Sequence, residues 1–281
     1  MSRFDPAAVL RVVLPALVLL SCDTAGTQPV TPRPLADFAE LLAPEQRRRA
    51  DALISVFEND TPEIQYGYAE DLHDGRGITA GRAGFCTGTG DAYEVVARYA
   101  ARRPDAQIVR FLPELRRLLT ADDPSDTHEL AGYEAAWATA AEDAAFRTVQ
   151  DAVVDSLYYR PALRRARTAG LKLPLAIVVV YDTIIQHGEG DDLDGLPALI
   201  ERTTRVLGGT PASGVDERRW LRTFLAVRRA TLLHAHDPAT REGWRASVDR
   251  VDILATLERT GALDLGGPLH IRSVHHTADI P

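Results

Sequence analysis

Apolar residues recur at helical spacing over most of the chain. Ala50, Leu53, Ile54 and Phe57 lie at positions i, i+3, i+4 and i+7, which places them on one face of an α-helix. Similar stripes occur in 90–103, 129–158, 171–187, 216–235 and 247–260. The pattern therefore predicts a mainly α-helical body.

Residues 66–90 depart from this spacing. Tyr66, Tyr68 and Leu72 alternate with other residues as in a strand, and glycines recur from Gly75 to Gly90. We predict a short strand-and-turn region inside a helical protein.

The first 21 residues have the features of an export signal. Arg3 and Arg11 supply positive charge, and the apolar run over 12–20 is too short to span a bilayer. Leu19-Leu20-Ser21-Cys22 resembles a bacterial lipobox, in which the cysteine is lipidated after cleavage. The alternative is an ordinary secretory signal followed by a chance cysteine.

This interpretation divides the chain into three parts. We predict a lipoprotein signal peptide over 1–21, a tether rich in Thr, Pro and Gly over 22–35, and one catalytic domain over 36–281. The mature protein is then exported. One possibility is that the lipid on Cys22 is its only attachment to the cell-envelope membrane. The other is that the protein is secreted.

Composition narrows the class of protein. The 281 residues are 45% hydrophobic and 26% charged, as in globular domains, and the net charge of -8 argues against nucleic acid as a partner. With Cys22 lipidated, Cys86 has no disulfide partner, and we expect it to be a small buried side chain. No Cys/His cluster has zinc-site spacing, since the two histidines of His234-Ala235-His236 would point to different sides of a helix. We expect a monomer without metal or cofactor.

Acidic residues are concentrated in one part of the chain. Between residues 58 and 94 there are eight carboxylates against Arg76 and Arg82. The carboxylates are Glu58, Asp60, Glu63, Glu70, Asp71, Asp74, Asp91 and Glu94. A solvated face is the usual explanation of such a run, but the glycines among the carboxylates are more typical of a loop shaped around a ligand, here a cationic one.

Two of these carboxyl groups suit acid and base roles. Glu58 follows the apolar stripe that ends at Phe57, so we expect it at a helix C-terminus, where the dipole and apolar neighbours favour its protonated form. Asp74 lies in the polar turn His73-Asp74-Gly75 and should remain ionised. Glycoside hydrolysis needs such a pair, because one carboxyl protonates the leaving oxygen while the other activates water.

Longer motifs around these residues resemble a known family. They are Phe57-Glu58-Asn59, the run 66–79 from Tyr66 to Thr79 with its Asp74-Gly75-Arg76-Gly77 turn, and the run 84–91 from Gly84 to Asp91. Together they resemble the family 46 glycoside hydrolases, the bacterial chitosanases. The similarity continues through Trp137, Tyr181-Asp182, His187-Gly188 and 224–228, and so covers roughly residues 45–270.

The resemblance implies a lysozyme-like α+β fold, with two helical lobes, a short β region and an open cleft between the lobes. It implies endo-hydrolysis of β-1,4 bonds in chitosan, or another cationic glucosamine polymer, with inversion. By motif position Glu58 is the general acid, Asp74 the general base, and Thr79 helps to hold the attacking water.

The resemblance also assigns supporting residues. Tyr68, Arg76 and Asp91 match cleft residues that orient the catalytic groups or contact sugar amines. Asp182 and Arg228 match a buried polar network behind the acid, to which we also assign Glu70.

The chain departs from the expected pattern in two places. Ile78 stands where an aromatic residue is expected, and no tryptophan occurs between Asn59 and Gln65. Aromatic faces supply area for sugar stacking, so both departures concern the sugar subsites.

Two other functions stay open. A peptidoglycan hydrolase of the same superfamily would use a similar glutamate, although the acidic region favours a polyamine sugar. A non-catalytic lipoprotein that binds polycations would need neither Glu58 nor Asp74.

Overall fold

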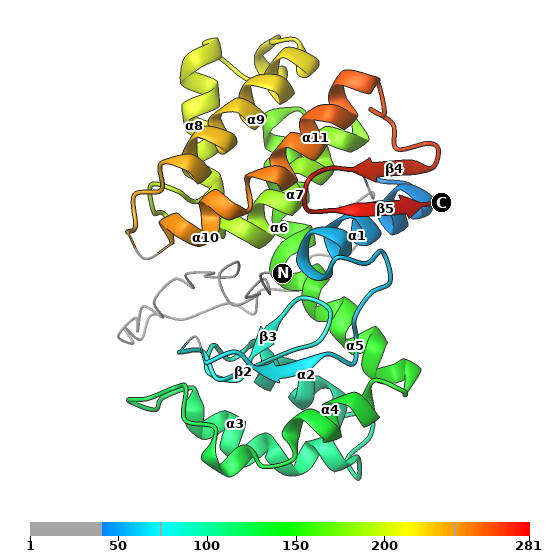
Figure 1. The fold of residues 1–281 in the computed structure, drawn as a ribbon, viewed down its shortest axis with the longest axis vertical. Coiled ribbons are helices and arrows are strands. Elements are labelled where there is room, and N and C mark those ends of the chain that lie inside the picture. The colour runs from blue at the N-terminus through cyan, green and yellow to red at the C-terminus, as the bar shows by residue number, and fades with distance from the viewer. Residues whose placement is uncertain (1–40, 74, 239) are drawn as a thin grey trace, which may run out of the picture.

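The computed structural model describes residues 41–73, 75–238 and 240–281. The predicted signal peptide, the tether with Cys22, and Asp74 therefore lie outside the described residues. The described chain forms two lobes, seen as the upper and lower halves of Figure 1.

The lower lobe contains three short strands and four helices. They are β1 (Ala69–Asp71), β2 (Ile78–Ala80), β3 (Phe85–Cys86), α2 (Asp91–Ala100), α3 (Leu112–Leu118), α4 (Tyr133–Ala140) and α5 (Ala144–Val154), with short 3₁₀ helices at Gln107–Phe111 and His128–Leu130. The strands form one antiparallel sheet in the order β1-β2-β3, in which Glu70 pairs with Thr79. The core of this lobe is aromatic, because the Trp137 ring packs against Tyr133, Phe146 and Phe85.

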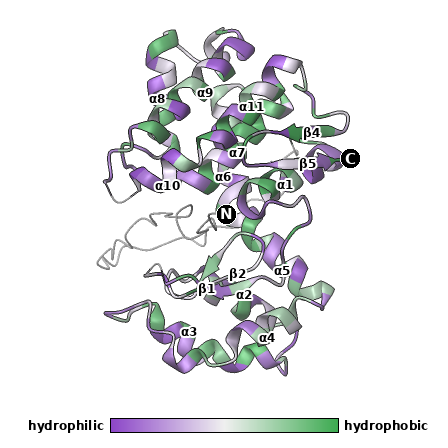
Figure 2. Cartoon of the chain, in the orientation of Figure 1, coloured by the Kyte–Doolittle hydropathy of each residue, from purple (hydrophilic) through white to green (hydrophobic). Residues whose placement is uncertain are grey.

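The upper lobe is helical. It contains α6 (Arg160–Ala169), α7 (Pro174–His187), α8 (Leu196–Leu207), α9 (Glu217–Leu233), α10 (Arg241–Ala246) and α11 (Val248–Thr260), with a 3₁₀ turn at Pro211–Ser213. Every residue of α7 from Leu175 to His187 is buried. A helix that is buried on all sides belongs in the middle of a bundle, and Figure 2 shows polar colour on the outer helices.

Two segments join the lobes, and the C-terminal hairpin lies beside the first of them (Figure 1). Helix α1 (Pro44–Asn59) points its C-terminal end at the space between them. A continuous helical run passes from α5 through a π-helical turn (Asp155–Tyr159) into α6. The C-terminal hairpin, β4 (Leu269–Arg272) paired with β5 (Thr277–Ile280), packs beside α1.

A glycine fixes the turn that leads into β2. Gly77 has φ +74°, and a Cβ atom there would collide with the Thr87 hydroxyl, which accepts the N–H of Ile78 at 3.0 Å. The Gly88 N–H donates to the Arg76 carbonyl at 2.9 Å. The turn that carries Arg76 is therefore held against the β3–α2 connection.

The predicted mainly helical class with a short β region is confirmed. The stripe over 129–158 is divided between two helices, because Asp143 starts α5 as its N-cap and accepts the Ala145 N–H at 2.8 Å. Cys86 is buried, as predicted. Within the described ranges no helix is long and apolar enough to cross a membrane.

Candidate active site

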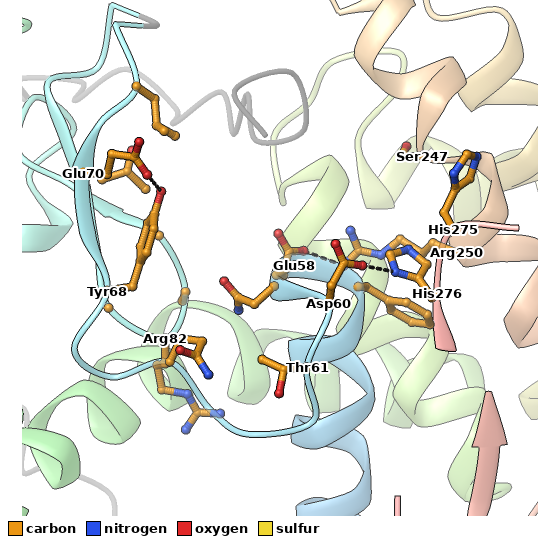
Figure 3. Close-up of a pocket in the computed structure, with 18 of the residues that line it drawn as sticks. Glu58, Asp60, Thr61, Tyr68, Glu70, Arg82, Ser247, Arg250, His275 and His276 are labelled. Atoms are coloured by element: carbon orange, nitrogen blue, oxygen red, sulfur yellow. Dashed lines mark hydrogen bonds and ion pairs between the residues drawn. The ribbon is translucent and has the colours of Figure 1, made fainter. Parts of the chain in front are cut away.

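A cleft of about 510 Å³ opens between the two lobes. One wall comes from the end of α1, the start of α11 and the turn of the C-terminal hairpin, and the other from the β1–β3 region (Figure 3). Its polar lining includes Glu58, Asp60, Thr61, Tyr68, Glu70, Arg76, Thr79, Arg82, Ser247, Arg250, His275 and His276.

Glu58 lies in the last turn of α1, as predicted. The apolar face of α1 buries Leu53, Val56 and Phe57, while the Glu58 side chain reaches the cleft and keeps 13% of its surface exposed. The backbone reverses at Asp60, whose φ is 58° and whose N–H donates to the Val56 carbonyl at 3.0 Å. The end of the helix therefore fixes where the Glu58 carboxyl enters the cleft.

A buried arginine holds Glu58. Arg250 Nη2 donates to Glu58 Oε1 at 2.6 Å, and the same guanidinium bonds Asp182 Oδ1 through Nε and Nη2 at 2.9 and 2.7 Å. Asp182 Oδ2 accepts Arg228 Nη1 at 2.5 Å, and neither of these two side chains is exposed. Burial alone would raise the pKa of Asp182, but Arg250 and Arg228 outweigh it and hold this pKa below its usual range.

The network continues behind Arg228. Its Nη2 donates to Gln186 Oε1 at 2.6 Å, and its Nε donates to His187 Nε2 at 3.3 Å. Because Nε2 accepts, His187 carries its proton on Nδ1, which donates to the Asp194 carbonyl at 2.8 Å. Burial, and then the charge of Arg228, hold the pKa of His187 well below its usual value, so this imidazole is neutral.

The opposite wall presents the strand residues. The Tyr68 hydroxyl donates to Glu70 Oε2 at 3.0 Å, and the buried Thr79 places its hydroxyl 3.5 Å from Cys86 Sγ. Figure 3 shows Tyr68 and Glu70 across the cleft from Glu58. Glu70 is therefore not joined to Asp182 and Arg228, with which the sequence analysis grouped it.

The structure places the remaining predicted residues differently. Arg76 lines the cleft, whereas Asp91 is not among the lining residues. The Asp91 carboxylate accepts the Cys86 N–H at 2.8 Å and the Thr89 hydroxyl at 2.7 Å, and burial raises its pKa. This bonding organises the start of α2, and a role of Asp91 in binding amines stays a prediction.

The arrangement in the cleft offers a carboxyl held by a buried guanidinium, but no cluster of metal ligands. Nowhere in the described ranges do three or more His, Cys, Asp or Glu side chains gather as a metal site would require. A carboxyl held by a guanidinium can serve in proton transfer and in charge stabilisation.

Comparison with known proteins identifies the family. The model of glycosyl hydrolase family 46 matches residues 52–269, which include every residue that lines the cleft except His275 and His276. The chain belongs to this family. It is therefore a glycoside hydrolase.

Two curated chitosanases match over most of their length. A chitosanase from Bacillus subtilis is 51% identical over 236 residues, which cover 84% of this chain and 85% of the relative. A chitosanase from a Streptomyces species is 34% identical over 274 residues, or 95% of this chain and 93% of the relative.

Solved structures of the family share the fold. A mutant chitosanase from Bacillus subtilis, complexed with six GlcN, matches with a TM-score of 0.79 and 49% identity over 85% of this chain and all of that one. A family 46 chitosanase from Gynuella sunshinyii, complexed with chitotetraose, matches with a TM-score of 0.78 and 50% identity over 85% of this chain and 99% of that one. The lysozyme-like arrangement of two lobes is consistent with both.

The structure changes the interpretation of Ile78, the residue that stands where an aromatic is expected in this family. Ile78 is only 2% exposed and packs in the core of the lower lobe, and it is not among the residues that line the cleft. Its side chain therefore affects packing of β2, and the interpretation of this position as a sugar-stacking site is wrong for this structure.

Sequence reasoning missed Arg250 and His276, and it named Asp60 only as one carboxylate of the acidic region. A signal for Arg250 was present, because it shares the apolar face of α11 with Leu254 and Leu257 at i+4 and i+7. A charged residue on such a face needs a buried partner. No comparable signal joins Asp60 to His276, which lies 216 positions later in the chain.

Proposed function

We propose that the protein hydrolyses internal β-1,4 bonds of chitosan with inversion, with Glu58 as general acid and Asp74 as general base. The observation that carries the proposal is the Glu58 carboxyl, which lies in an interlobe cleft and is fixed by the buried Arg250. The two curated relatives described above are named chitosanases, which supports the choice of substrate.

The contact with Arg250 supports one oxygen of Glu58 as the proton donor in the proposed reaction. Oε1 accepts the Arg250 N–H at 2.6 Å, which leaves Oε2 to carry the acidic proton. In the proposed reaction Oε2 protonates the glycosidic oxygen while the bond from that oxygen to the anomeric carbon breaks. A water attacks the anomeric carbon from the opposite face and loses its proton to Asp74, and the Thr79 hydroxyl orients this water.

Charge in the cleft favours a cationic sugar over an N-acetylated one. Three arginines, Arg76, Arg82 and Arg250, also line the cleft. Asp51 and Asp151 pair with Arg82, and Glu58 and Asp182 pair with Arg250. Asp60 and Glu70 are exposed carboxylates in the same lining. An ammonium group gains from such carboxylates, whereas the neutral amide of peptidoglycan or chitin does not.

A panel of polymers tests the substrate. Wild type should release reducing ends from chitosan and leave peptidoglycan and fully acetylated chitin almost intact. The Glu58→Gln variant is the matched control, because it keeps the shape of the side chain and should lose about 10²- to 10⁴-fold in kcat. Equal release from chitin, or cleavage of peptidoglycan alone, would contradict the proposal.

We also propose that the mature protein begins at a lipidated Cys22 and is held at a membrane of the cell envelope. The support is the run Leu19-Leu20-Ser21-Cys22 after an apolar segment. Stable attachment takes more than one acyl chain, which the diacylated cysteine of lipoproteins supplies. Mass spectrometry of the mature N-terminus should find this cysteine modified, and a Cys22→Ser protein that is processed and located like wild type would defeat the proposal.

A further inference from the structure

Asp60 has a backbone conformation that favours glycine. It is the C-cap of α1, with φ 58° and ψ 17°, and its side chain is 75% exposed in the cleft lining. Aspartate is tolerated in this left-handed region, but a glycine there would be less strained. A carboxylate is therefore present at a position where the backbone alone would favour no side chain.

A histidine from the other end of the chain orients this carboxylate. His276 Nδ1 donates to Asp60 Oδ1 at 2.6 Å, and the His276 ring packs edge-on against Phe57, with ring centres 5.9 Å apart. Only 15% of the His276 side chain is exposed. Figure 3 shows the Asp60–His276 pair beside Glu58.

The hairpin turn that carries His276 is itself fixed. The Ser273 hydroxyl donates to Asp249 Oδ2 at 2.5 Å, and the His276 N–H donates to Ser273 Oγ at 3.0 Å. Asp249 precedes Arg250 in α11, so the same helix end holds both the hairpin turn and the partner of Glu58. The His276 imidazole thus holds Asp60 Oδ1 from a fixed position. Asp60 Oδ2 has no hydrogen-bond partner within the described residues.

We propose that Asp60, oriented by His276, binds the ammonium group of a glucosamine unit next to the bond that Glu58 protonates. This inference rests on the proposed function. A carboxylate with one oxygen fixed and the other open to the cleft can accept hydrogen bonds from an ammonium, and the ion pair is charge-assisted. An N-acetylated sugar carries no ammonium group, so Asp60 would not increase its affinity to a comparable extent.

The competing explanation is that the Asp60–His276 pair only stabilises the packing of the hairpin on α1. The Asp60→Gly variant distinguishes this structural role from a binding role. Glycine relieves the strained backbone but removes the carboxylate. For a binding role we expect an unchanged or higher Tm with a raised KM. A purely structural role would give a lower Tm with KM unchanged.

The chain offers a matched control on the same hairpin. His270 Nδ1 donates to Asp279 Oδ1 at 2.7 Å, and both side chains are more than 60% exposed. Neither residue lines the cleft. His270→Phe therefore removes the same kind of contact without touching the proposed subsite. Asp279→Asn removes that contact together with the ion pair between Arg272 and Asp279.

The experiment measures kcat and KM on glucosamine hexamer for Asp60→Asn, Asp60→Gly and His276→Phe beside these controls. An exposed ion pair predicts that KM rises about two- to fivefold, with kcat within a factor of about two. The increase should vanish near 1 M salt, where the Debye length is about 3 Å. Both control variants should match wild type.

A binding measurement separates this inference from the proposed function. Calorimetry with the hexamer on Glu58→Gln protein, with and without Asp60→Asn, needs no turnover. A weaker affinity in the double variant supports the inference even if wild type cleaves no chitosan. Unchanged affinity and KM in every Asp60 variant, or equal losses in the His270 and Asp279 controls, would overturn it.

Discussion

Replacing Asp182 by asparagine removes the carboxylate that lies between Arg228 and Arg250. Both arginines are almost fully buried, at 0% and 2% exposure, so the variant leaves two guanidinium groups without their shared counter-charge. Breaking a buried ion pair from one side costs about 3–5 kcal/mol. At roughly 2–4 °C per kcal/mol for a domain of this size, Tm should fall by about 6–20 °C.

A matched control lies on the neighbouring surface. Arg229 follows Arg228 in α9 and pairs with Asp252 at 2.7 Å, but both members are nearly half exposed. Asp252→Asn should therefore cost about 1 kcal/mol or less. Scanning calorimetry of both variants at pH 7 makes the comparison, and an Asp182→Asn protein that melts within about 2 °C of the Asp252→Asn protein would refute the argument.

The same variant should show a characteristic pH dependence. The pKa of Asp182 is lower in the folded protein than in the unfolded chain, so its stabilisation is complete above the unfolded value of about 3.9. This stabilisation is lost as pH falls below that value. The difference in unfolding free energy between wild type and Asp182→Asn should therefore be constant above about pH 5 and should shrink below about pH 4. Since Arg250 also loses its anchor, kcat should fall with Tm at neutral pH.

Three further predictions concern other parts of the molecule. Neutral His187 lowers stability as pH falls below about 6.5, because the unfolded chain then binds a proton that the folded protein excludes; in urea titrations His187→Asn should reduce this slope, which is at most about 1.4 kcal/mol per pH unit, and an unchanged slope would contradict the assignment to His187. Gly77→Ala should lower Tm more than Gly261→Ala, because both have positive φ but only the first meets a neighbouring atom; equal Tm values would show that the contact with Thr87 is unimportant. Thr79→Ala should lower kcat on chitosan less than Glu58→Gln does, since the hydroxyl only orients water, and a loss as large as that of Glu58→Gln would assign Thr79 a larger part.

The residues predicted best are those whose signal is local. The stripe ending at Phe57 placed Glu58 at a helix end, and the structure has it in the last turn of α1. The burial of Cys86 and the strand-and-turn region also followed from neighbouring residues. These features depend on contacts that a short window of sequence already contains.

Long-range contacts were not predictable in this way. Arg250 meets Glu58 across 192 positions, and His276 meets Asp60 across 216. Strands β4 and β5 were missed because each has only four residues, too few for a clear alternation. Tertiary packing, which no local pattern encodes, assembles this wall of the cleft.

The initial stereochemistry of the product tests the central claim most directly. Glucosamine hexamer is mixed with wild-type protein, and the anomeric proton signals are recorded by NMR within the first minutes, before mutarotation. Water attack on the face opposite to the leaving oxygen, with Glu58 as acid and Asp74 as base, predicts that the α anomer appears first. The β anomer appearing first, or a glycosyl group trapped on Asp74, would contradict the account.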